Sequence, residues 1–134
     1  DFKSTLHPHV KTVTENMIAG TSSKVFRQFW KCYVKGKFLS YDHGPEGNLK
    51  AYGTETPVDY MSHYNLVDIP IHFMAGQNDK LIPAKDCFKH YKTLHRHSPH
   101  LATCKPFEGR GHIDFTYGLD QEMTNEIFTH AAPP

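Results

Sequence analysis

The spacing of apolar residues in the first half of the chain predicts one helix and little other regular structure. Residues 22–37, SSKVFRQFWKCYVKGK, carry apolar and aromatic side chains every three to four positions, with a serine able to cap the start and Gly36 able to end the helix. We expect this aromatic stripe to pack in a core, as such stripes usually do. Residues 1–21 have few periodic apolar positions and predict an irregular segment. Glycines and prolines interrupt residues 38–64, which predicts mostly loop with short extended pieces.

The second half of the chain alternates between strand-like and helix-like patterns. Residues 69–76, IPIHFMAG, form a short apolar run that ends in glycine, which is typical of a buried strand. Residues 84–97 predict a helix with its apolar positions on one face. A second strand is predicted over residues 101–107, ending near Pro106, and a final helix over residues 115–128. The order of strand, helix and strand predicts a parallel pair of strands in an α/β fold.

Composition narrows the class of protein. The chain has 134 residues, enough for one domain or a piece of a larger one, and 38% of them are hydrophobic, which suits a packed core. With 15 basic and 14 acidic residues the net charge is +1, so no nucleic-acid partner is expected. No apolar run has the length of a membrane span and no signal peptide is visible, so the compartment is not determined. Because the chain begins with Asp1 instead of methionine, we expect a processed product or a fragment.

The three cysteines do not define a redox class. Cys32, Cys87 and Cys104 have no CxxC spacing, and their odd number argues against a complete disulfide framework. This pattern allows two alternatives. One is a single disulfide, for example between Cys87 and Cys104, and the other is three free thiols.

Two ionisable residues follow the two predicted strands. Asp79 comes after the first strand and His112 after the second, about one strand–helix–strand crossover later. Because catalytic groups gather at the carboxyl ends of parallel strands, we expect the two side chains to lie close together. An aspartate that orients a histidine base is two thirds of a nucleophile–His–Asp triad, and the chain order fits α/β-hydrolases. The alternative is that Asp79 only forms a turn or caps a helix, and that His112 is an ordinary loop histidine.

Five segments carry motifs in a distinctive order and spacing. They are AGTSSK (19–24), VKGKFLSYDHG (34–44), NLKAYGTETPVDY (48–60), NLVDIPIHFMAGQNDKLIPAKD (65–86) and GHIDFTYGLD (111–120). Together they resemble the C-terminal region of the acid lipase family of α/β-hydrolases, which includes gastric and lysosomal acid lipases and steryl ester hydrolases. The resemblance extends over roughly residues 18–129.

The resemblance implies a fold and roles for individual residues. It implies the C-terminal part of an α/β-hydrolase, with the return from the cap region over residues 1–64 and the last strand–helix units over residues 65–134. Asp79 would be the triad acid and His112 the triad base, and no cofactor is implied. Asp114 would be structural, organising the His112 loop or capping the final helix. The aromatic helix would pack in the core or line part of an acyl-chain pocket.

A serine nucleophile is missing from the sequence. An α/β-hydrolase places this serine in a G-x-S-x-G turn. Ser22 comes nearest to this pattern, but Lys24 stands where the second glycine belongs. The chain has six serines and none fits: Ser4, Ser22, Ser23, Ser40, Ser62 and Ser98.

The chain alone is therefore expected to be inactive. We expect it to supply the acid and base of a lipid-ester hydrolase and to pack against the missing N-terminal half, another chain or a copy of itself. The alternative is a hydrolase-like module that serves as a binding or structural subunit without turnover.

Histidine-rich stretches raise the question of a metal site. No cysteine or carboxylate completes a recognisable zinc spacing around them, and histidines at helix ends are commonly solvated, so we expect no metal site. The histidines concerned are His7, His9, His90, His95, His97 and His100.

Overall fold

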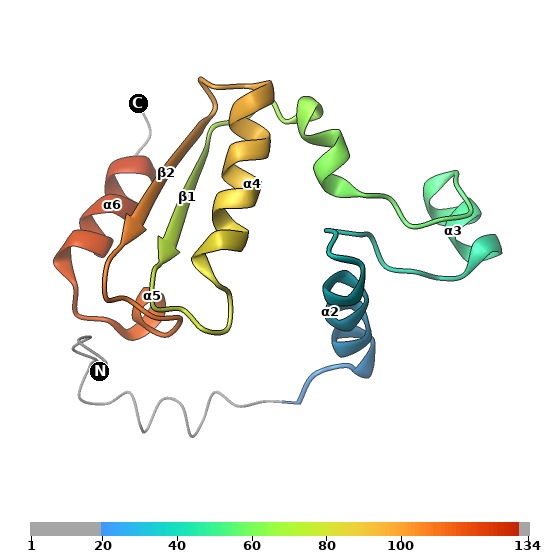
Figure 1. Ribbon diagram of the computed structural model, residues 1–134, viewed down its shortest axis with the longest axis horizontal. Coiled ribbons are helices and arrows are strands. Elements are labelled where there is room, and N and C mark those ends of the chain that lie inside the picture. Colours follow the sequence, from blue (N-terminus) through green and yellow to red (C-terminus); the bar gives the residue numbers. More distant parts are fainter. Residues whose placement is uncertain (1–19, 132–134) are drawn as a thin grey trace. The chain divides into compact units, whose positions relative to one another are not determined.

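The computed structural model describes residues 20–131, which form two units (Figure 1). One contains residues 20–67 and the other residues 68–131. The elements are α2 (Ser23–Lys35), α3 (Pro45–Tyr52), the 3-10 helix η1 (Tyr60–Leu66), β1 (Ile71–Gly76), α4 (Ala84–His97), β2 (Ala102–Phe107), α5 (Asp114–Tyr117) and α6 (Gln121–Ala131). The irregular segment predicted for residues 1–21 lies almost wholly outside the described residues. Within residues 20–131, no helix combines the length and the apolar character that crossing a membrane requires.

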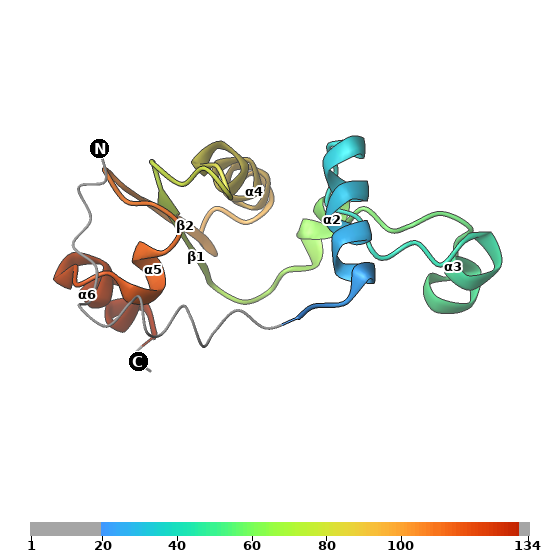
Figure 2. The same cartoon turned by 90° about the horizontal axis from the view of Figure 1, so that it is seen from below.

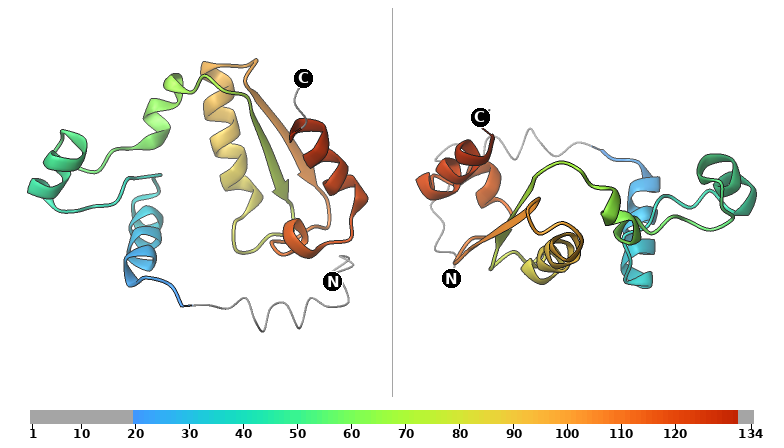
Figure 3. Two further views of the ribbon diagram at one scale, coloured as in Figure 1. Left: turned by 180° about the vertical axis from the view of Figure 1, so that it is seen from behind. Right: turned by 90° about the horizontal axis from the view of Figure 1, so that it is seen from above.

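The C-terminal unit is a two-stranded parallel sheet between helices. β1 and β2 pair in parallel from Ile71 opposite Ala102 to Gly76 opposite Phe107, which confirms the predicted parallel pair. Figures 2 and 3 show α4 and α6 on opposite faces of this sheet. The predicted helix over residues 84–97 is confirmed as α4. The unit therefore has the mixed, layered arrangement of an α/β fold.

Alternation along each strand decides which side chains meet which helix. Phe73 of β1 packs edge to face against Tyr91 of α4, with ring centroids 6.1 Å apart. The neighbouring His72 faces the opposite way and contacts Glu126 of α6. Successive strand residues point to opposite faces, so one strand serves both helices. The buried apolar residues of the unit are few: Ala75, Leu94, Ala102, Phe107 and Met123.

The final helix is not continuous. The predicted helix over residues 115–128 is divided into α5 and α6, and Gly118 between them has an extended backbone with φ −66° and ψ 144°. The Asp120 Oδ1 atom accepts a hydrogen bond from Glu122 N at 2.9 Å, which starts α6. The predicted helix continued across this break because apolar residues, Leu119 among them, keep a helical spacing there. Such spacing does not reveal a capping aspartate.

The first helix of the N-terminal unit forms as predicted, but its aromatic stripe is not a core. Ser22 Oγ accepts from Lys24 N at 3.2 Å, and Gly36 ends the helix with a left-handed φ of 60°. Among the described residues, however, α2 has no buried side chain, and Phe26, Trp30 and Tyr33 are 66%, 66% and 79% exposed. The core-packing prediction is wrong because no described element of this unit covers the aromatic face.

The prediction of loop over residues 38–64 is also partly wrong. This stretch contains α3, which starts with Pro45 in its first turn, and most of η1, which Asp59 caps by accepting from Met61 N at 3.2 Å. Proline favours the first turn of a helix, so it marked a beginning here and not a break. The extended part is an isolated antiparallel bridge between Leu39 and Asp59.

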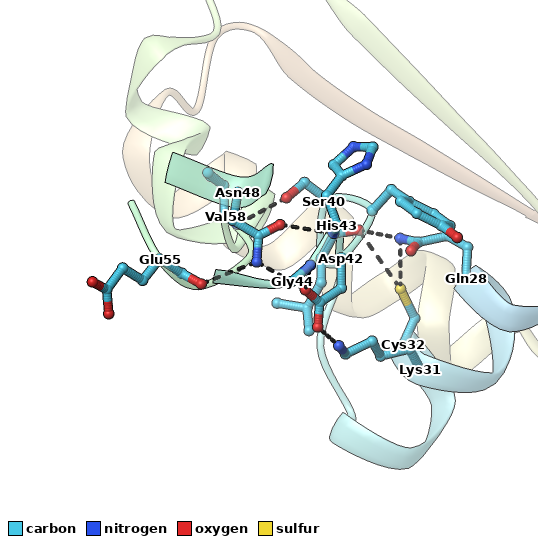
Figure 4. A network of polar contacts seen from close by, with 12 residues as sticks. Gln28, Lys31, Cys32, Ser40, Asp42, His43, Gly44, Asn48, Glu55 and Val58 are labelled. Atoms are coloured by element: carbon cyan, nitrogen blue, oxygen red, sulfur yellow. Dashed lines mark hydrogen bonds and ion pairs between the residues drawn. The ribbon is translucent and has the colours of Figure 1, made fainter. Parts of the chain in front are cut away.

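Polar contacts hold the N-terminal unit together (Figure 4). Asn48 is 1% exposed, and its Nδ2 donates to Asp42 Oδ1 at 2.8 Å and to the Glu55 carbonyl at 3.0 Å. Its Oδ1 accepts from His43 N at 2.9 Å, and Lys31 forms an ion pair with Asp42. A buried amide that satisfies three partners fixes the loops around it. The motif segments around residues 40–48 therefore serve as structure in this unit.

Candidate active site

The two candidate catalytic residues meet at one edge of the sheet. Asp79 follows β1 and His112 follows β2, and both strands end at this edge beside α5 (Figure 1). The Nδ1 atom of His112 lies 2.9 Å from Oδ2 of Asp79. Since parallel neighbours present their carboxyl ends together, two residues far apart in the chain come into hydrogen-bonding contact. The structure thus brings together the pair that the sequence singled out, while their catalytic role remains a prediction.

The Asp79 carboxylate is held on both oxygens. Oδ1 accepts hydrogen bonds from Leu81 N and Ile82 N, each at 2.8 Å, while Oδ2 faces His112. The side chain is only 6% exposed. Burial by itself raises the pKa of Asp79, but the hydrogen bonds from Ile82, His112 and Leu81 outweigh it and hold the pKa below its ordinary value. Asp79 is therefore an anion at neutral pH, and it forms the turn as well as contacting the histidine.

The His112 ring is open to solvent on one side. Its side chain is 45% exposed, in contrast to the buried carboxylate beside it. A carboxylate at Nδ1 favours the tautomer with the proton on that nitrogen. The lone pair then lies on Nε2, which is the nitrogen that a general base uses in a Ser–His–Asp triad. The pair is thus set up to accept and return a proton.

The loop that carries His112 is braced from within. Gly109 takes a left-handed φ of 71°, and Gly111 N donates to Asp114 Oδ2 at 2.5 Å. Asp114 is 5% exposed and organises this loop, one of the two structural roles expected for it, while Asp120 caps the last helix. Arg110 forms an ion pair with Asp120 at 2.6 Å. These contacts limit the positions open to the His112 backbone.

Gly76, which the apolar run indicated only as the end of a strand, allows the loops after β1 and β2 to approach closely. A Cβ atom there would lie 2.6 Å from the Arg110 carbonyl oxygen, a distance at which backbone must shift. The two loops approach this closely because Asn78 N donates to Arg110 O at 2.9 Å and Gln77 N donates to Phe107 O at 3.0 Å. A glycine at the end of a strand, three residues before a candidate aspartate, is a signal for such a close approach.

Replacing Gly76 with alanine is expected to push the two loops apart. We expect the free energy of unfolding to fall by about 1–3 kcal/mol, as for other overpacked sites. Hydrogen exchange at the Asn78 amide should accelerate, because its acceptor Arg110 O is the atom displaced. Gly20→Ala is the matched control, since no atom lies within 4 Å of a Cβ at Gly20. Unchanged exchange at Asn78 would show that the loops tolerate the methyl group.

No described serine of the C-terminal unit accompanies the pair. Ser98, the one serine among residues 68–131, ends α4 and precedes β2, at the opposite edge of the sheet from His112. Ser62, in the other unit, lies 3.1 Å from His63 Nδ1, but its hydroxyl donates to the Asp59 carbonyl at 2.6 Å within η1. Within residues 68–131, the Asp79–His112 pair therefore has no serine beside it.

Comparison with known proteins points to lipases. The chain is 30% identical over 110 residues to Triacylglycerol lipase 1 of Arabidopsis thaliana, a match that covers 82% of this chain and 26% of that protein. The chain thus spans about a quarter of the length of this relative. No protein-family model matches the chain, and no solved structure does. The match supports a lipase-like relationship for this chain.

Proposed function

We propose that this chain is the C-terminal portion of a serine lipid-ester hydrolase of the acid lipase type, with an α/β-hydrolase fold. In this proposal Asp79 is the triad acid and His112 the triad base. The observation that carries it is the 2.9 Å contact between these residues at the carboxyl edge of two adjacent parallel strands. The chain order of aspartate before histidine and the similarity to a plant lipase support the same assignment.

In the complete enzyme a serine upstream of this segment attacks the carbonyl carbon of a lipid ester. Nε2 of His112 takes the serine proton as the new C–O bond forms, and the Asp79 carboxylate stabilises the imidazolium. His112 returns this proton to the alkoxide oxygen as the ester C–O bond breaks, which releases the alcohol. A water molecule then gives a proton to His112 and attacks the acyl-enzyme. Collapse of the second intermediate returns that proton to serine and releases the fatty acid.

The rest of the hydrolase is the proposed partner of this chain. The aromatic face of α2 is exposed, and two parallel strands leave edges of the sheet unpaired among the described residues. Exposed apolar faces and open sheet edges usually mark an interface. The plant relative is nearly four times as long as the matched region, which leaves ample chain to cover them.

An apolar hollow in the N-terminal unit suits an acyl chain. It has a volume of about 330 Å³, within the range typical of small-molecule sites. Val25 and Phe29 of α2 contribute to its wall together with Tyr41. Both Phe29 and Val25 are exposed in the described chain, so the hollow is accessible to a lipid tail.

Intact mass and active-site labelling of the native protein test this proposal. We expect a native polypeptide larger than the 15.4 kDa of this segment, labelled by a fluorophosphonate on a serine upstream of it. Heat-unfolded protein is the control, because fluorophosphonates need an activated serine. A native protein of 15.4 kDa that never takes the label would contradict the enzyme and support a non-catalytic binding or structural module.

A further inference from the structure

A second cluster of ionisable side chains lies on the α6 face of the sheet. His72 comes from β1, while Glu126 and His130 come from α6. Nε2 of His72 lies 2.9 Å from Glu126 Oε1, and Nε2 of His130 lies 3.2 Å from the same oxygen. The His72 and Glu126 side chains are 13% and 17% exposed. His72 and Glu126 are therefore largely shielded from solvent, and the cluster takes no part in the Asp79–His112 pair.

The three side chains form a donor set for a transition metal. One ligand atom from each lies within 4.8 Å of the other two. Two imidazoles and a carboxylate are a protein ligand set that zinc accepts, with a fourth position left to water. Glu126 and His130 are four residues apart on a helix, which places them on one face above His72.

The surroundings of His72 favour its use as a ligand. Its Nδ1 lies 2.7 Å from Thr103 Oγ1, and this contact orients the ring so that Nε2 faces Glu126. Such outer hydrogen bonds commonly orient metal-binding histidines.

Two features show what must move when an ion enters. The His72 and His130 rings are stacked, with centroids 3.7 Å apart and planes at 12°, so one ion cannot lie in both ring planes. His130 is 40% exposed in the last turn of α6, so its ring has room to rotate and turn a nitrogen toward the ion. Lys105 Nζ contacts Glu126 Oε2 at 2.9 Å, which leaves Oε1 for the metal, and Glu122 at 3.0 Å also holds the Lys105 ammonium.

We propose that His72, Glu126 and His130 bind one zinc ion, which ties the C-terminal half of α6 to β1. The proposal departs from the expectation of no metal site, and none of its three residues belongs to the histidine-rich stretches. Among residues 20–131, this is the group of three or more ligand side chains that the fold draws together. The proposed zinc site does not depend on ester hydrolysis, so the zinc proposal and the proposed hydrolase function can be contradicted independently.

Titration of the metal-free chain with zinc chloride tests the site, and cobalt chloride reports its geometry by visible absorption. We expect one ion per chain with the absorption of a tetrahedral cobalt centre. His130→Gln and His72→Gln should each weaken binding by at least about tenfold. The matched control is the double variant His97→Gln, His100→Gln, which removes two histidines outside the cluster and should bind as the parent does. Zinc should raise the Tm of the parent and of the control, but not of His130→Gln.

The outcomes distinguish a defined zinc site from nonspecific zinc binding by the histidine-rich stretch. Binding that survives His130→Gln and His72→Gln overturns the proposal. If zinc binding is lost only in the control that lacks His97 and His100, the ion binds at the end of α4, which also overturns the proposal. His130 is exposed at a helix end, so this variant should keep its circular dichroism spectrum and remain a valid test if His72→Gln fails to fold.

Discussion

Replacing His112 with glutamine in the serine-bearing polypeptide is expected to lower kcat by about 10⁴-fold or more, the scale seen when a triad histidine is removed from serine hydrolases. Glutamine can still hydrogen-bond to Asp79 but cannot take a proton from serine. The free energy of unfolding should change little, because the His112 side chain is 45% exposed. Hydrolysis of a chromogenic fatty-acid ester measures the effect, and urea denaturation measures stability.

A histidine outside the proposed triad provides the control for this experiment. His97 is the exposed last residue of α4, and His97→Gln should keep full turnover. Labelling by a fluorophosphonate should slow in His112→Gln as much as ester hydrolysis does, because both need the activated serine. If the glutamine variant retained esterase activity, His112 would have no place in the mechanism.

Replacing Asp79 with asparagine is expected to lower kcat by about 10⁴-fold as well, with little change in KM. That magnitude comes from the same replacement in another Ser–His–Asp enzyme. The asparagine oxygen can still accept from Leu81 N and Ile82 N, so the turn should persist. An amide NH₂ facing His112 instead favours the tautomer with its lone pair on Nδ1, which removes the base from Nε2. Asp68→Asn, at an exposed position before β1, is the control and should be fully active.

The same variant gives a prediction for pH dependence. The pKa of Asp79 is lower in the folded chain than its ordinary value, so the ionised carboxylate stabilises the fold. This stabilisation is present above the unfolded carboxyl pKa of about 4 and is lost as pH falls through the lower folded pKa. Between pH 7 and pH 2, the free energy of unfolding of Asp79→Asn should therefore fall less steeply than that of the parent. An acid limb identical to that of the parent would show that Asp79 gains nothing from its hydrogen bonds.

Local patterns were sufficient for the elements that carry the candidate site. Residues 84–97 repeat apolar positions at helical spacing, and the runs on either side are short and apolar, so a helix between two strands followed directly. Parallel neighbouring strands need a crossover of about this length, so the pattern favoured a parallel pair with Asp79 and His112 at one edge. Their separate strands, their order and their loop positions are all properties of the linear sequence.

Three other features could not be predicted from periodicity. The aromatic stripe of α2 has a helical period whether or not anything covers it, so the sequence could not tell a buried face from an exposed one. The break at Gly118 depends on a local Asp120 cap that competes with helix continuation. The prolines and glycines of residues 38–64 occur at helix ends as well as in loops, so they did not distinguish the two.

Short-range periodicity and chain order were enough to predict the strand–helix–strand order, the parallel pairing and the candidate acid and base. The close approach at Gly76 and the meeting of His72 with Glu126 and His130 arise in the folded chain, and their geometry has no signature in the sequence pattern. Both contacts depend on how the strands, the loops and α6 pack against one another, and no local spacing in the sequence encodes those distances.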